Sequence, residues 1–167
     1  MTAKGDGLTA SRLATLVLIV GAAAILAALA FEHIGGYKPC PLCLRERIAY
    51  YAGVPVTLVA LVMMQAGRRG FAGVLLALVA VGFLVNAGLG VYHSGVEWKW
   101  WAGPTACSGA GGLTLESGSV LEELSQTKVI RCDEAPFRFA YLSFAGWSAV
   151  ISLGLAVTAL AAALRSR

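Results

Sequence analysis

Charged residues are scarce in this sequence. Only 13% of its 167 residues are charged, whereas 58% are hydrophobic. A soluble domain normally has about 25% charged residues, so a soluble globular fold is disfavoured. The 13 lysines and arginines exceed the nine carboxylates, but they form no contiguous basic stripe. Nucleic-acid binding is therefore not expected.

Several catalytic motifs are also absent. The sequence has no glycine-rich phosphate loop, no serine nucleophile elbow and no charged residue inside its long apolar runs. A nucleotide-dependent enzyme, a serine hydrolase and an ion transporter are therefore disfavoured. Any chemistry is expected in loops or at helix ends.

Four long uncharged runs predict four transmembrane helices. The runs cover residues 13–31, 48–67, 70–92 and 139–164. Each has about the 20 residues that a helix needs to cross a bilayer core. We expect an all-α, integral membrane four-helix bundle that forms one membrane domain over residues 1–167. A cleavable signal peptide is the alternative for the first run, although the run exceeds the usual signal core.

Basic residues in the short segments beside the runs predict the orientation. These residues are Lys4, Arg12, Arg68, Arg69, Arg165 and Arg167. Because lysine and arginine gather in short cytoplasmic segments, we expect both termini in the cytoplasm. The loops over residues 32–47 and 93–138 then lie on the exported side. All four cysteines are in these loops, as expected where disulfides persist.

The four cysteines form one close pair and one distant pair. Two residues separate Cys40 from Cys43, and 24 residues separate Cys107 from Cys132. The distant pair lacks the spacing of a compact four-cysteine zinc site, so no metal is expected. A non-catalytic four-span scaffold with two structural disulfides is an alternative. However, a disulfide within Cys-X-X-Cys braces very little chain.

The residues after Cys40 predict the start of a helix. Proline is favoured at the first helical position, so Pro41 places Cys40 at or near the N-cap, where helix N–H groups favour a thiolate. A helix that starts there has four side chains on one face: Cys40, Cys43, Arg47 and Tyr51. Arg47 could then keep a thiolate ionised and polarise a carbonyl oxygen of an electron acceptor. An arginine that snorkels to the interface is the alternative.

These features together resemble the DsbB family of bacterial disulfide bond formation proteins. The resemblance begins at residues 40–47, CPLCLRER, and covers almost the whole chain. It includes four spans, a distant cysteine pair in the second exported loop, and the stretch CDEAPF at residues 132–137 before the last span. Cys-X-X-Cys alone is a weak signal. Cys-X-X-Cys-X-X-X-Arg at the entrance of a span, together with the distant pair, is specific.

The resemblance implies a function and a location. The protein would be a quinone-dependent thiol-disulfide oxidoreductase of the bacterial inner membrane, with its cysteine loops facing the periplasm. It would reoxidise a periplasmic DsbA-like thiol oxidase and pass the electrons to ubiquinone or menaquinone. Its partners would be that oxidase, membrane lipid and the quinone pool.

The resemblance also implies roles for individual residues. The oxidase would attack a Cys107–Cys132 disulfide and form a mixed disulfide with Cys107. Cys132 would then attack Cys40, which frees Cys43 as a thiolate beside quinone. Arg47 matches the arginine that the family associates with quinone. His93, at the end of the third run, is expected to contact quinone or to be an interfacial anchor, and Tyr51 joins the predicted quinone-binding set.

Overall fold

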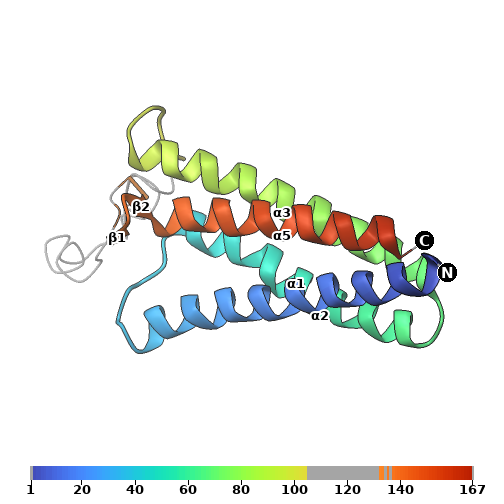
Figure 1. Cartoon of the computed structure of the whole chain (residues 1–167). Helices are drawn as coiled ribbons and strands as arrows, with labels where there is room; N and C mark the ends of the chain where they lie inside the picture. The colour runs from blue at the N-terminus through green and yellow to red at the C-terminus, as the bar shows by residue number, and fades with distance from the viewer. Residues whose placement is uncertain (1, 105–131, 134, 136, 167) are drawn as a thin grey trace, which may run out of the picture.

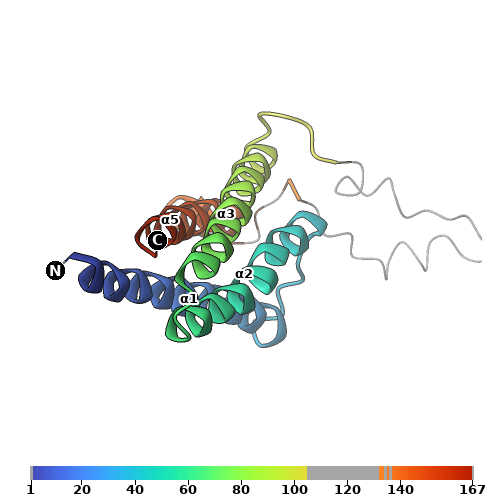
Figure 2. The ribbon, with the colours of Figure 1, turned by 90° about the vertical axis from the view of Figure 1, so that its right-hand side faces the viewer.

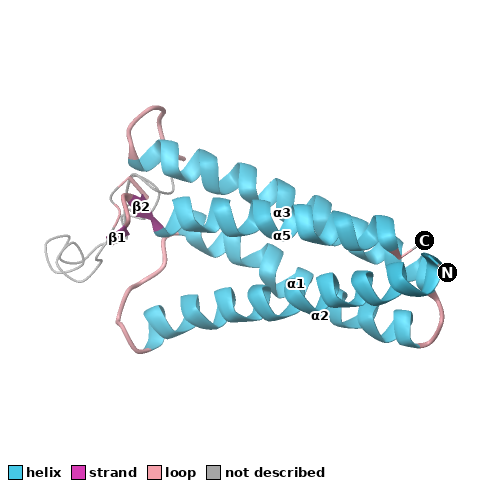
Figure 3. Cartoon of the chain, in the orientation of Figure 1, coloured by secondary structure: helices cyan, strands magenta, loops and turns pink. Residues whose placement is uncertain are grey.

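The computed structural model describes residues 2–104, 132, 133, 135 and 137–166. Four long helices dominate it: α1 (Thr2–His33), α2 (Pro41–Gln65), α3 (Arg69–Glu97) and α5 (Phe144–Arg165). Two short antiparallel strands, β1 (Arg138–Phe139) and β2 (Leu142–Ser143), precede α5 (Figure 3). All four helices are long and apolar enough to cross a membrane. The predicted all-α, four-span architecture is confirmed.

The four helices run alternately up and down. Both termini lie at one end of the bundle, and the β1–β2 hairpin lies at the other (Figure 1). In the described residues each helix packs mainly against two others, in the cyclic order α1, α2, α3, α5, and the α3–α5 contact is the most extensive. The second view shows α3 and α5 side by side, with α1 beside α2 (Figure 2). The connection from α1 to α2 and the C-terminal end of α3 both lie at the hairpin end (Figure 1).

The helices differ in their bounds from the predicted spans. Helices α1 and α3 extend beyond the predicted residues 13–31 and 70–92 at both ends. Helix α2 begins seven residues before position 48 and ends two residues before position 67, whereas α5 begins five residues after position 139. Uncharged runs mark only the part of a helix that lies in hydrocarbon, and helical hydrogen bonding continues into the interface. Residues 138–143 form the hairpin instead of helix, with Ala140 and Tyr141 at φ of 50° and 67°. Most of the loop predicted at 93–138, including Cys107, lies outside the described residues.

Small side chains fill the bundle near the termini. A buried cluster there is made of Ala14, Ala60, Leu61, Ala72, Leu76, Ala162 and Ala163. Small residues let helix backbones approach closely, which is the usual basis of helix packing in a bilayer. Helices α3 and α5 also approach closely at Gly90 of α3, where an added Cβ would lie 2.9 Å from the backbone nitrogen of Ala149 in α5.

A polar network ties three helices together in mid-bundle. The Tyr50 hydroxyl of α2 and the Ser152 hydroxyl of α5 are 3.0 Å apart, and the Asn86 side-chain amide of α3 donates to the same Ser152 oxygen over 2.9 Å. Phe83 packs edge-on against Tyr50. Interhelical hydrogen bonds of this kind add stability in the absence of water. The network also fixes Tyr50, which lines the cavity described in the next subsection.

Candidate functional site

The site begins at the N-terminus of α2. Cys40 is the N-cap residue in an extended conformation, Pro41 is the first helical residue, and the Cys40 sulfur accepts a 3.1 Å hydrogen bond from the Cys43 backbone N–H. The predicted helix start is therefore confirmed. Both thiols are free, and Cys40 is buried.

Neighbouring groups favour the Cys40 thiolate. The pKa of Cys40 is lowered, chiefly because the Cys43 thiol hydrogen-bonds to its sulfur. Burial acts in the opposite direction, and the hydrogen bond from the Cys43 backbone N–H supports the lowering. Cys40 is thus the residue of the pair whose thiolate forms more readily.

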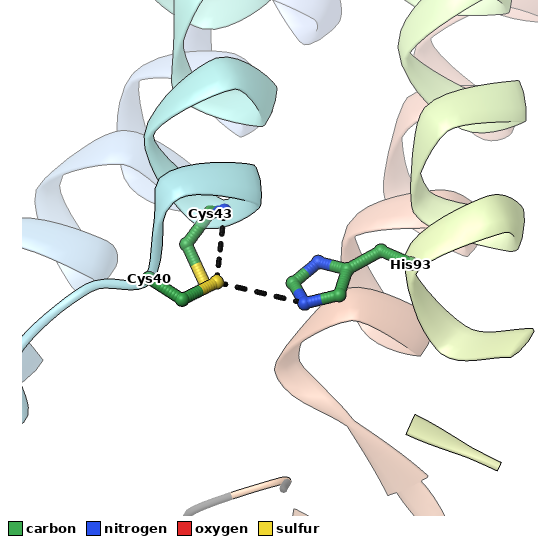
Figure 4. A group of neighbouring side chains, drawn as sticks. All are labelled: Cys40, Cys43 and His93. Atoms are coloured by element: carbon green, nitrogen blue, oxygen red, sulfur yellow. Dashed lines mark hydrogen bonds between the residues drawn. The ribbon is translucent and has the colours of Figure 1, made fainter. Parts of the chain in front are cut away.

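His93 lies between the Cys40 thiol and a buried carboxylate. The His93 Nε2 atom is 3.6 Å from the Cys40 sulfur (Figure 4), and its Nδ1 atom is 2.7 Å from Glu46 Oε1. A second carboxylate, Glu97, is one helical turn further along α3, with its Oε1 atom 4.0 Å from His93 Nε2. All three side chains are buried. The sequence placed His93 near an electron acceptor or at the interface; the structure brings it to Cys40.

A cavity opens beside the two thiols. It has a volume of about 640 Å³ and mostly apolar walls, which is the size range of small-molecule sites. The helices around it contribute Cys43, Arg47, Tyr50 and His93 as polar groups, and aromatic rings form part of the wall: Phe31, Tyr37, Phe144 and Trp147. An apolar chamber with a few convergent polar groups suits a flat aromatic ligand with polar edges.

Arg47 is anchored at the cavity wall by α1. Its guanidinium forms an ion pair with Glu32 and donates to the backbone oxygen of Ala28 over 3.4 Å. The sequence predicted that Arg47 and Cys43 share a face of α2, and the structure places both on the cavity. The Arg47 guanidinium is therefore paired with a carboxylate, and Arg47 lines the same cavity as the two thiols.

Tyr51 does not reach this site. Its side chain is 52% exposed and is absent from the cavity wall, where Tyr50 lies instead. Four residues turn a helix by about 400°, so each step from Cys43 to Arg47 to Tyr51 rotates the side chain about 40° past a full turn. Two such steps carry Tyr51 off the inner face. The prediction also used Cys40 as a helical residue to define the face. Cys40 is the N-cap and is not helical, so its position does not define which side chains share that face.

The second cysteine pair is described in part. Cys132 is buried and disulfide-bonded. It packs in one hydrophobic cluster with Cys40, Leu42 and Val96. Cys107 lies outside the described residues. The structure thus brings together Cys40, Cys43 and Cys132, which the sequence placed in two separate loops.

Three carboxylates of the site were missed by the sequence analysis. Glu46 and Glu97 are buried beside His93, and Glu32 pairs with Arg47. The positions of two of them could have been predicted. Glu46 is three residues after Cys43 and Glu97 is four residues after His93, and residues at these spacings share one face of a helix. The position of Glu32 could not, since its partner is on another helix.

Comparisons with known proteins agree on one family. The family model described as disulfide bond formation protein DsbB matches residues 10–162. The chain is similar to disulfide bond formation protein B of Marinobacter nauticus, with 31% identity over 90% of this chain and 89% of that protein. It is also similar to the protein of that name from Xanthomonas oryzae, with 32% identity over 79% and 77% of the two chains. No solved structure matches the chain.

Proposed function

The chain belongs to the DsbB family of disulfide bond formation proteins, and on that premise we propose that it reoxidises a periplasmic DsbA-like thiol oxidase and passes the electrons to membrane quinone. Family membership itself implies a disulfide-forming oxidoreductase embedded in a membrane by several helices. The partner, the acceptor, the inner-membrane location and the periplasmic orientation are the proposed part.

One observation supports the proposal most strongly. Free thiols at Cys40 and Cys43 pack with a buried disulfide-bonded cysteine, Cys132, and all three residues line one mostly apolar cavity. A protein that only braces its loops would need neither the free pair nor the cavity. The arrangement suits a relay in which electrons enter at Cys132 and leave at Cys43.

The proposed exchange balances in thiols and disulfides. A reduced oxidase opens a Cys107–Cys132 disulfide and releases Cys132 as a thiolate. Cys132 then attacks Cys40 of an oxidised Cys40–Cys43 pair, so that a Cys132–Cys40 disulfide forms and Cys43 leaves as a thiolate. The second thiol of the oxidase then displaces Cys107, and Cys107 attacks Cys132, which restores the Cys107–Cys132 disulfide and releases Cys40. The reduced Cys40–Cys43 pair gives two electrons and two protons to the acceptor as its own disulfide re-forms.

The cavity residues fit a quinone ring. Quinone would supply the two-electron, two-proton acceptor chemistry. Arg47 would hold and polarise one carbonyl oxygen from the cavity wall, while aromatic rings would sandwich the ring and exclude water. His93 contacts Cys40 and has its other nitrogen fixed by Glu46, so it is placed to accept a thiol proton.

The test is quinone reduction by the purified, detergent-solubilised protein with a reduced thioredoxin-like oxidase as donor. We expect the unmodified chain to turn over, Cys43→Ser to be inactive and Arg47→Ala to be weakened. A chain that never reduces quinone while its cysteines remain stably paired would support the structural scaffold instead.

A further inference from the structure

Three metal-binding side chains converge where α2 begins and α3 ends. The sulfurs of Cys40 and Cys43 and a ring nitrogen of His93 all lie within 4.8 Å of one another (Figure 4). Two thiolates and one imidazole are a zinc ligand set. We propose that the reduced Cys40–Cys43 pair binds a zinc ion together with His93.

The distance between the Cys40 sulfur and the His93 ring nitrogen agrees with two ligands of one tetrahedral ion. With Zn–S near 2.3 Å and Zn–N near 2.05 Å, a tetrahedral angle separates sulfur from nitrogen by about 3.6 Å. The Cys40 sulfur and His93 Nε2 are 3.6 Å apart. The two side chains are therefore spaced for the ion without movement of the helices. The four-cysteine spacing that argued against zinc did not include this histidine.

The outer shell also has the form of a metal site. A zinc-bound histidine usually gives its other nitrogen to a carboxylate, which fixes the ring and its tautomer. Here Nε2 faces the thiol, and Nδ1 is 2.7 Å from Glu46 Oε1. Glu46 is itself buried, so this contact is shielded from water. The imidazole is held ready to bind through Nε2.

A buried carboxylate oxygen near the site is without a partner. Glu97 Oε2 has no hydrogen-bond partner among the described residues, and its side chain is 4% exposed. An orphaned buried carboxylate is costly and needs an explanation. A water in the open fourth position of the ion could donate to it. The two thiolates would neutralise the zinc charge, which lowers the cost of burying the ion.

The site would exist only in one redox state. Zinc would displace a proton from each of the two thiols and form two Zn–S bonds, with no change in oxidation state. The Cys40–Cys43 disulfide offers no thiolate and would not bind. Metal occupancy would therefore withhold the pair from oxidation. Zinc binding needs the two free thiols and His93 but no electron transfer, so it does not depend on the proposed quinone chemistry.

The experiment uses the full chain in detergent with Cys107→Ser and Cys132→Ser, so that only the pair at Cys40 and Cys43 can bind through sulfur. Zinc is titrated against a competing chelating indicator, first with the pair reduced and then with it oxidised. We expect one zinc per reduced chain and none per oxidised chain. Cobalt titrated in the same way should give the thiolate-to-cobalt absorbance of two bound sulfurs.

Two histidine variants separate the site from adventitious binding. His93→Ala should weaken zinc binding at least tenfold, whereas His33→Ala, at the exposed end of α1, should leave it unchanged. Glu46→Gln should weaken it by about 10–100-fold as an outer-shell partner. Equal binding by the oxidised chain, equal losses in both histidine variants, or no binding by the reduced chain would each overturn the proposal. The comparison of redox states needs no substitution at the site, so misfolding of a variant cannot mask the result.

Discussion

The two ends of the bundle are built on opposite principles. The end with the termini is packed with buried alanines and a few leucines. The end with the hairpin buries Cys40, Glu46, His93, Glu97 and Cys132. Small apolar side chains allow close packing at no electrostatic cost, whereas each buried ionisable group needs a partner. The end with the termini therefore stabilises the fold. The end with the hairpin holds reactive groups in fixed positions, and their burial lowers the stability of the fold.

The largest expected effect is at the reactive end. Glu46→Ala leaves His93 Nδ1 buried without a partner, which should lower the free energy of unfolding by about 2 kcal/mol. The histidine also loses its orientation, so quinone reduction should fall about a hundredfold. Thermal unfolding in detergent and turnover measure the two effects. Glu46→Gln, which can still hydrogen-bond to the ring, should recover most of the stability; an equal loss in both variants would contradict the orienting role.

A packing change should separate stability from chemistry. Gly90→Ala places a Cβ 2.9 Å from the backbone of Ala149, so it should cost about 1–3 kcal/mol through overpacking. Activity per folded molecule should remain close to that of the unmodified chain. The matched control is Gly82→Ala on the same helix, where an added Cβ meets nothing within 4 Å. A Gly82→Ala chain as unstable as Gly90→Ala would refute the account of α3–α5 packing.

The ion pair at the cavity wall should matter for binding more than for folding. Glu32→Gln removes the carboxylate that anchors Arg47, so we expect a several-fold rise in KM for quinone with little change in kcat. The midpoint of thermal unfolding should stay almost constant, because the pair is partly exposed. Arg45→Gln, a charge change at an exposed position of α2 outside the cavity wall, serves as the control. An unchanged KM in Glu32→Gln would exclude a positioning role for this carboxylate.

The smallest expected effect is a shift in the pH profile of Cys40. Because the Cys43 thiol lowers the pKa of Cys40, the reactive thiolate should persist at a lower pH than that of an ordinary cysteine. Cys43→Ala removes the main cause, so the profile should move to higher pH. The rate of modification by a small thiosulfonate reagent, with a chelator present to remove metal, measures both profiles. A shift to lower pH in Cys43→Ala would contradict the assignment.

The two ends also differed in how far the sequence could predict them. The four helices follow from uncharged runs, and the helix start at Cys40 follows from Pro41, because hydrophobicity and local backbone chemistry are sequence-local properties. The Glu46–His93 and Glu32–Arg47 contacts join different helices, so no spacing within one run reveals them. Tyr51 shows how far positions on a helix face can be predicted from spacing alone. Each step of four residues rotates the side chain by about 40°, so after two steps from Cys43 the side chain no longer points to the cavity.

The most direct measurement of the central claim is a single turnover without the partner oxidase. The chain with Cys107→Ser and Cys132→Ser is reduced, freed of reductant and metal, and mixed with one equivalent of a short-chain quinone, and thiols and quinone are counted over time. The account predicts that one quinone is reduced for every two thiols lost, with Cys40 and Cys43 recovered as a disulfide. If quinone stays oxidised while both thiols persist, or if Cys43→Ser reduces it equally well, the assignment of this pair as the electron donor is wrong.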